Sequence, residues 1–159
     1  MCKPLFCTIS GINPCSFGLD EKNPDCITMK LAMVSKINEL YLSGVTNFVC
    51  NCEMGIPLWA AEAALCVRTL HPVRLHIAIP YENQVALWAD EWRERYFNIH
   101  EQADSVTMLQ KQFEEDCYIN CDRLMIDHSD LLLWVGSRGG FITEYTKRQG
   151  KHVILIAAR

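Results

Sequence analysis

Short apolar runs alternate along the chain with longer segments of helical periodicity. The clearest strand-like runs are 5–10, 75–79, 130–135 and 152–157, and weaker ones are 48–50 and 105–109. In the segments between them, apolar residues recur every three or four positions, as on helices that cover a sheet. Strands that alternate with helices are typical of a parallel sheet. The pattern therefore predicts an α/β, Rossmann-like three-layer fold with a mostly parallel central sheet flanked by helices.

The helical segments carry recognisable start and stop signals. The first is predicted to end at Ser43-Gly44, a common C-terminal signal, and to bury Ile27, Leu31, Val34, Ile37, Leu40 and Tyr41. The second begins near Pro57 and is apolar nearly all round up to Leu70, which predicts a buried helix. The segment 81–103 predicts a helix joined to a long loop, and 143–149 a short helix.

A further helix, between the weak strand 105–109 and the strong strand 130–135, has two distinct sides. Its predicted buried side consists of Phe113, Cys117, Cys121, Leu124 and His128. The acidic residues Glu114, Glu115, Asp122 and Asp127 are predicted to face away from the core.

The composition is that of an ordinary globular protein. With 159 residues, half of them hydrophobic and 21% charged, the chain suits a single domain over 1–159. The longest apolar stretches fall far short of the roughly 20 residues of a membrane span, so no membrane association is expected. No secretory signal is recognised, and nine cysteines are an odd count for a disulfide framework. A cytoplasmic protein with reduced thiols is therefore expected.

The charge pattern bears on the kind of partner. The formal net charge is -4, and lysine and arginine form no block. Nucleic-acid binding usually leaves a basic footprint, so no nucleic-acid partner is expected. A small anionic ligand stays compatible with this charge, because helix N-termini and backbone N–H groups bind phosphate without a net positive charge.

Three turn-rich loops join a strand to a helix, at 11–18, 51–57 and 136–143. In open α/β sheets, ligands collect beyond the carboxyl ends of the strands, where helix N-termini present free N–H groups. Glycine also lets the backbone approach a ligand closely. The candidate ligand-binding residues are Gly11, Glu53, Met54, Gly55, Trp59, Glu62, Ser137, Arg138, Gly139, Gly140 and Thr143.

Structural alternatives accompany these candidates. Thr143 suits the N-cap of the next helix, Trp59 suits the core, and Glu62 suits a solvated or paired charge. Cys117 and Cys121 are one helical turn apart and His128 follows, but a zinc site needs a fourth ligand, and a core stripe is the favoured interpretation. No metal and no cofactor is predicted.

The loop residues resemble a known family, the YpsA-like proteins of the SLOG superfamily. The resemblance is clearest in the central motif from Asn51 to Ala64, which includes Leu58-Trp59-Ala60-Ala61-Glu62. Gly11-Ile12-Asn13-Pro14 with Phe17-Gly18 resembles their first loop, and Gln102-Ala103-Asp104, Asn120 and Ile126 to Asp130 resemble later segments. The resemblance implies a Rossmann-like fold and a nucleotide-derived ligand, for example one that contains ribose or ADP-ribose.

The chain departs from the related phosphoribohydrolases at two loops. Those proteins carry a Pro-Gly-Gly-x-Gly-Thr-x-x-Glu type of motif, whereas this chain has Ile142 before Thr143, and Tyr145 and Thr146 at the expected acid positions. The family's central loop usually has glycine where this chain has Cys52. The catalytic residues of those hydrolases are therefore not matched, and the sequence leaves open whether the protein is an enzyme.

Three functions follow as hypotheses. In the leading one the chain binds or senses a nucleotide-like molecule: Gly139, Gly140 and Thr143 hold phosphate or ribose, Arg138 pairs the charge, and Gly11 and the 53–55 loop close the other side. The second is hydrolysis of an N-glycosidic or phosphate bond, with Glu53, Glu62 and Glu144 as candidate carboxylates. The third is an interaction protein with a vestigial cleft and a partner surface at 88–92, whose tryptophans alternatively cover the sheet edge or the cleft. Self-association is expected in each case.

Overall fold

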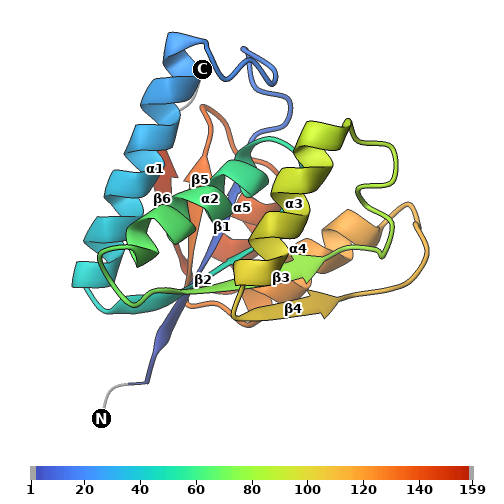
Figure 1. Ribbon diagram of the computed structural model, residues 1–159. Coiled ribbons are helices and arrows are strands. Elements are labelled where there is room, and N and C mark those ends of the chain that lie inside the picture. Colours follow the sequence, from blue (N-terminus) through green and yellow to red (C-terminus); the bar gives the residue numbers. More distant parts are fainter. Residues whose placement is uncertain (1–2, 158–159) are drawn as a thin grey trace.

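A single parallel sheet with helices on both faces forms the protein in the computed structural model, which describes residues 3–157 (Figure 1). Within that range the strands are β1 (Leu5–Gly11), β2 (Val45–Cys50), β3 (Arg74–Ile79), β4 (Ser105–Met108), β5 (Leu131–Val135) and β6 (His152–Ile156). The helices are α1 (Pro24–Leu42), α2 (Ile56–Arg68), α3 (Asp90–Gln102), α4 (Cys117–Asp127) and α5 (Phe141–Arg148). Every strand and helix that the periodicity predicts is present.

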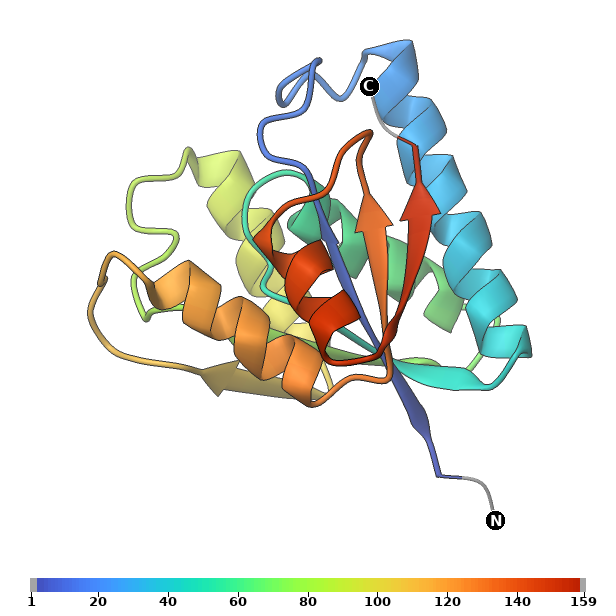
Figure 2. The same cartoon turned by 180° about the vertical axis from the view of Figure 1, so that it is seen from behind.

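The strand order explains how the two layers of helices arise. The six strands lie in the order β4-β3-β2-β1-β5-β6, and every neighbouring pair is parallel. The chain runs outward from β1 to β4, then returns to place β5 on the other side of β1. Because crossovers between parallel strands are right-handed, α1, α2 and α3 cover one face, and α4 and α5 cover the other (Figures 1 and 2). The predicted Rossmann-like three-layer fold is confirmed, with a wholly parallel sheet.

The most apolar segments lie where they were expected. Leu132, Leu133 and Val135 of β5 are fully buried, and nine residues of α2 are buried, including Leu58, Trp59 and Ala61. The start of α2 lies very close to β1. A Cβ on Gly11 would lie 2.6 Å from two side-chain carbons of Ile56 and 2.7 Å from the carbonyl oxygen of Val135. Glycine at this position therefore allows α2 to begin directly against the sheet.

The predicted buried face of α1 is wrong in part. Ile37 and Leu40 are buried as expected, but Ile27 and Leu31 are 47% and 65% exposed. The helix instead buries Cys26, Met29 and Met33 together with Ile37 and Leu40. Both sets of residues have helical spacing, so periodicity does not choose between them. The unbranched Met and small Cys side chains fit the space over the sheet, which decides the rotation of the helix.

The predicted faces of α4 also need correction. Cys117 and Cys121 are buried as predicted, and the Cys121 thiol donates to the carbonyl oxygen of Ala78 over 3.2 Å. Phe113 precedes the helix and is exposed, and His128 is exposed at its C-terminal end. Asp122, expected to face solvent, is half-buried. The helix is therefore rotated so that one of its carboxylates turns toward the carboxyl edge of the sheet.

The structure also bears on the expectations about the cysteines and about membrane-spanning helices. Eight of the nine cysteines lie in residues 3–157 and are free thiols, and Cys2 lies outside the described residues. Across residues 3–157, none of the helices combines the length and apolar content that a membrane crossing requires.

Candidate functional site

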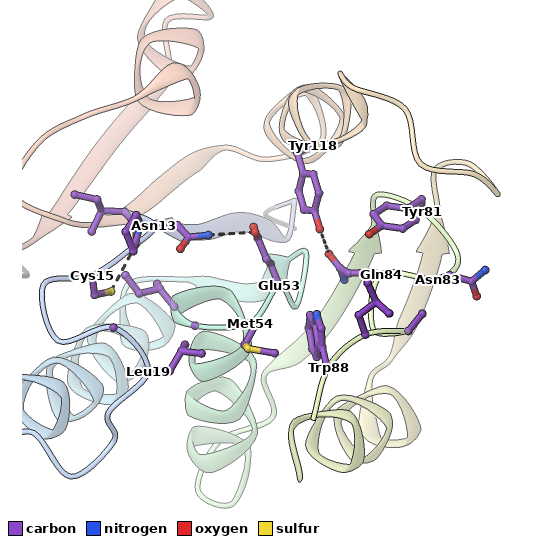
Figure 3. A pocket seen from close by; sticks show the side chains of 17 residues that line it. Asn13, Cys15, Leu19, Glu53, Met54, Tyr81, Asn83, Gln84, Trp88 and Tyr118 are labelled. Carbon is purple, nitrogen blue, oxygen red and sulfur yellow. Dashed lines mark hydrogen bonds between the residues drawn. The ribbon is translucent and has the colours of Figure 1, made fainter. Parts of the chain in front are cut away.

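A cavity lies at the carboxyl edge of the sheet and is called here the main cavity. Its volume is about 680 Å³. Three strand-to-helix loops line it, with residues from 12–19 after β1, from 53–56 after β2 and from 81–88 after β3, and Tyr118 of α4 lies opposite (Figure 3). The parallel sheet brings these loops together because all its strands end at the same edge.

The turn from β2 into α2 has a backbone that suits a binding loop. Cys52 has a φ of 57° and Gly55 a φ of 105°, both in the left-handed region. A Cβ on Gly55 would meet only a methyl carbon of Leu19, at 3.8 Å, so the backbone borders open space. The N–H of Glu53 donates to Oδ1 of Asn51 over 2.9 Å, which fixes this turn. The loop therefore presents backbone to the cavity at the start of α2.

Amide and aromatic side chains form the wall on the β3 side. Gln84 is buried, and its Nε2 donates to the carbonyl oxygen of Asn51 over 3.2 Å. The Tyr118 hydroxyl donates to Oε1 of Gln84 over 3.0 Å (Figure 3). The Tyr81 ring lies edge-on to Tyr118, with centroids 6.3 Å apart, and Trp88 packs edge-on against Tyr96 at 5.4 Å. These contacts fix which polar atoms and ring faces border the cavity.

A smaller cavity adjoins the main one between β1 and β5, where the direction of strand addition reverses. Its volume is about 240 Å³, and it shares Glu53 and Tyr118 with the main cavity. Its other lining residues are Ser10, Gly11, Asn51, Asp122, Trp134, Phe141 and Ile142. Ligands of open α/β folds bind at this reversal point, so the two cavities together form the candidate site.

Two carboxyl groups give this site its electrostatic character. Burial raises the pKa of Glu53, although a hydrogen bond from Asn13 Nδ2, 3.2 Å long, partly opposes this. Burial, with a smaller contribution from the Glu53 charge, raises the pKa of Asp122 to about 7. Within the described chain, no lysine, arginine or histidine lines either cavity. The site therefore carries negative charge or none, depending on pH.

Part of the predicted site is brought together here. Glu53, Met54 and Gly55 line the main cavity, and Gly11 lines the smaller one. Trp59 is 1% exposed and packs against Phe17 and Trp92, both with centroids 6.2 Å away, which is the core position of its structural alternative.

Glu62 lies outside both cavities. Its carboxylate accepts from Arg95 Nη2 over 2.6 Å and from Nε over 3.1 Å, so it has the paired-charge role of its structural alternative.

Most of the third predicted loop, 136–143, lines neither cavity, and only Phe141 and Ile142 near its end reach the smaller one. Ser137, Arg138, Gly139 and Gly140 are exposed and line neither of them. Thr143 Oγ1 accepts from the N–H of Gly140 over 2.9 Å and donates to its carbonyl oxygen over 2.8 Å. A Cβ on Gly139 would lie 2.5 Å from Thr143 Oγ1. The loop is therefore closed by its own contacts, and its ligand-binding role stays a prediction.

The contribution of the 81–88 segment and of α4 to the site was not predicted from the sequence. The lining residues that were not predicted are Asn13, Tyr81, Asn83, Gln84, Trp88, Tyr118 and Asp122. The available signal was Pro80, which stops β3 and so marks another strand-to-helix loop. Trp88 and Trp92 do not form the partner surface considered for 88–92, since Trp88 lines the cavity and Trp92 is 8% exposed. Trp88 instead matches the alternative in which these tryptophans cover the cleft.

Fold and cavities together define a Rossmann-like domain with a ligand-sized site at the carboxyl edge of its sheet. The chain belongs to the YpsA family: the family model described as the YspA SLOG family matches residues 7–139. This confirms the family that the loop motifs indicate.

The relatives have names that state no function. A UPF0398 protein, BH1768 of Halalkalibacterium halodurans, is 31% identical over 66% of this chain, which spans 57% of that protein's length. The UPF0398 protein OB1025 of Oceanobacillus iheyensis is 26% identical over 79% of this chain and 70% of its own length.

One solved structure shares the fold across nearly the whole chain. It comes from a study titled "Structural insights into the unique single-stranded DNA binding mode of DNA processing protein A from Helicobacter pylori". The TM-score is 0.63 and the identity 16%, with 98% of this chain and 66% of that chain covered. The expectation that nucleic acid is excluded as a partner is therefore wrong, because a protein that shares this fold has a single-stranded DNA binding mode. Net charge does not decide the matter, because single strands also bind through local grooves and aromatic stacking.

Proposed function

We propose that the protein binds a nucleotide-derived small molecule in the main cavity and its smaller extension. The observation that carries the proposal is the main cavity itself, about 680 Å³ in volume, lined by three strand-to-helix loops at the carboxyl edge of a parallel sheet. Small-molecule sites are typically about 300–1,000 Å³ in volume and lie at this place in such folds. Free buried thiols such as Cys7 and Cys50 suit a reducing compartment, so we include a cytoplasmic location in the proposal.

The lining suits a planar, hydrogen-bonding ligand. Trp88, Tyr81 and Tyr118 offer aromatic surface, and stacking of a base on such a ring contributes roughly 1–3 kcal/mol. Asn13, Asn83 and Gln84 bring amides, each of which has donors and an acceptor for the edge of a base. The orientation of Gln84 is already set by its bonds to Asn51 and Tyr118, so its amide is preorganised.

Hydrolysis of a nucleotide is the second candidate function. Of the three carboxylates predicted for it, only Glu53 lies in the candidate site. Glu53 lines both cavities, and its raised pKa suits a general acid. Glu62 is bound by Arg95, and Glu144 is 66% exposed beside Lys147 on α5. Release of free base or phosphate from a nucleoside 5′-monophosphate, lost in Glu53→Gln, would support this activity over binding alone.

Isothermal titration calorimetry tests the binding. The panel consists of the four ribonucleosides, their 5′-monophosphates, ADP-ribose and a short single-stranded oligonucleotide, included because of the structural neighbour. At least one small molecule is expected to bind, and Trp88→Leu should weaken it about tenfold through loss of stacking. Phe97→Leu is the matched control, because Phe97 is a half-exposed aromatic of α3 outside both cavities. Equal losses in the two variants, or no binding across the panel, would refute the proposal.

A further inference from the structure

The two adjoining cavities hold acids and no bases. Glu53 lines both, Asp122 lines the smaller one, and the described residues add no lysine, arginine or histidine to either lining. Figure 3 shows Glu53 between Asn13 and Tyr118, with its carboxylate held by the Asn13 amide. A ligand that reaches the junction of the cavities therefore meets carboxyl groups.

The start of α2 offsets this charge only in part. Helix N-termini bind phosphate through free N–H groups, but Pro57 at the second position of α2 has none. The N–H of Glu53 is bound by Asn51, and the N–H of Leu58 donates to the carbonyl oxygen of Glu53 over 3.0 Å. The Glu53 side chain also lies at this end of the helix, where a phosphate would otherwise profit from the helix dipole.

The same lining suits hydroxyl and amino donors. A carboxylate accepts hydrogen bonds from hydroxyl groups, and such charge-assisted bonds are stronger than bonds between neutral groups. A phosphate in the same place would be repelled by the carboxylates of Glu53 and Asp122, because like charges repel at short distance. The linings thus favour a sugar over a phosphate at the junction of the two cavities.

We propose that the site is selective for unphosphorylated nucleosides, with Glu53 accepting hydrogen bonds from the ribose hydroxyls and Trp88 stacking on the base. This inference rests on the proposed function and narrows its ligand class. Glu53 is then a specificity-determining residue, and Asp122 reinforces the rejection of a phosphate from the smaller cavity.

The test compares each ribonucleoside with its own 5′-monophosphate by calorimetry at pH 8 on the full chain. The tightest nucleoside is expected to bind at least tenfold more strongly than its monophosphate. Glu53→Gln removes the charge and retains the shape, so it should weaken the nucleoside, strengthen the monophosphate and bring their ratio close to one. Glu144→Gln, at an exposed carboxylate of α5 outside both cavities, should leave the ratio unchanged.

The possible outcomes separate the two proposals. A monophosphate that binds as tightly as its nucleoside, or more tightly, overturns the selectivity and leaves ligand binding intact. A ratio that Glu53→Gln does not change overturns the role of Glu53. No binding of any nucleoside or nucleotide overturns both proposals. If Glu53→Gln does not fold, Asp122→Asn is the second variant, and it should raise the affinity for the monophosphate alone.

Discussion

Tyr118 donates its hydroxyl hydrogen to Oε1 of Gln84 over 3.0 Å and thereby joins the two helical layers across the edge of the sheet. Tyr118 belongs to α4 on one face, whereas Gln84 lies in the loop that leads to α3 on the other (Figures 1 and 3). Gln84 in turn reaches the end of β2 through Asn51. A ligand in the main cavity would contact all three segments, so its affinity depends on their relative positions.

Tyr118→Phe should therefore lower both stability and ligand affinity. It leaves the buried Oε1 of Gln84 without its partner, which costs about 1–3 kcal/mol of unfolding free energy, and it frees an amide of the cavity wall. We expect about a fivefold loss of affinity in calorimetry. Tyr145→Phe is the matched control, because that hydroxyl donates to Asp127 over 2.6 Å at the exposed surface. Equal losses of stability in denaturant would contradict the structural role of Tyr118.

Asp122→Asn should stabilise the protein at neutral and alkaline pH. The folded-state pKa of Asp122 is raised to about 7, above its ordinary value of 3.8, so between these values the folded state binds more protons than the unfolded state. Stability contributed by this group therefore falls as pH rises from about 4 to 7. The amide removes the penalty, with an expected gain on the order of 2 kcal/mol at pH 8 and none near pH 4. Urea unfolding at both pH values measures it, and a gain independent of pH would argue against the buried carboxyl.

Cys52 should tolerate a β-branched residue far less well than Cys50. Both thiols are buried, but Cys52 has a φ of 57°, where a branched side chain is strained by about 1–3 kcal/mol. Cys52→Val is expected to lose about 2 kcal/mol more unfolding free energy than Cys50→Val. Cys52→Gly should be close to neutral, since relief of strain offsets the lost thiol contacts. Denaturant titrations of the three variants decide this, and equal costs for the two valines would exclude backbone strain.

The Arg95 network should stabilise the fold without affecting the ligand. Arg95 Nη1 lies 2.6 Å from Glu21 Oε1, and hydrogen bonds from Arg95, assisted by Lys30, lower the pKa of Glu21 to about 2. Because this pKa is depressed, the contribution is full above about pH 4.5 and is lost as pH falls toward 2. Arg95→Met should cost about 1–2 kcal/mol at pH 7, clearly less at pH 2.5, and leave ligand affinity unchanged. A Kd that shifted with this variant would place the network in the site.

Arg138 offers a direct comparison of the two candidate binding regions. It is exposed in the 136–143 loop and lines neither cavity, although the sequence predicts it as a charge partner for phosphate. Arg138→Ala should leave nucleoside affinity within about twofold of the parent, because its charge is screened by solvent. A larger loss of affinity in calorimetry would indicate that the predicted glycine loop contributes to ligand binding.

The sequence predicted the fold more fully than the site. The unbroken apolar run of β5 and the alternation of elements were sufficient for the layers, because burial on both faces leaves a clear pattern. On α1, the two stripes that begin at Cys26 and Ile27 have the same period, so packing alone distinguished them. Glu53 and Gly55 were predicted as candidate residues because they follow a strand and open a helix. Tyr118 and Asp122 were missed because the rotation of α4 depends on contacts across the sheet.

Gly11 has a mechanical consequence for the site. Because α2 begins with Ile56 in near contact with Gly11 of β1, the wall formed by 53–56 is held firmly against that largely buried strand. The opposite wall, 81–88, is an irregular segment held by Gln84 and by ring contacts such as Tyr81 with Tyr118. The 81–88 wall can therefore move more easily than the 53–56 wall. Adjustment of the cavity to a ligand would occur mainly at 81–88. If the proposed ligand binds in the main cavity, the range of ligand sizes that fit depends on how far 81–88 can move.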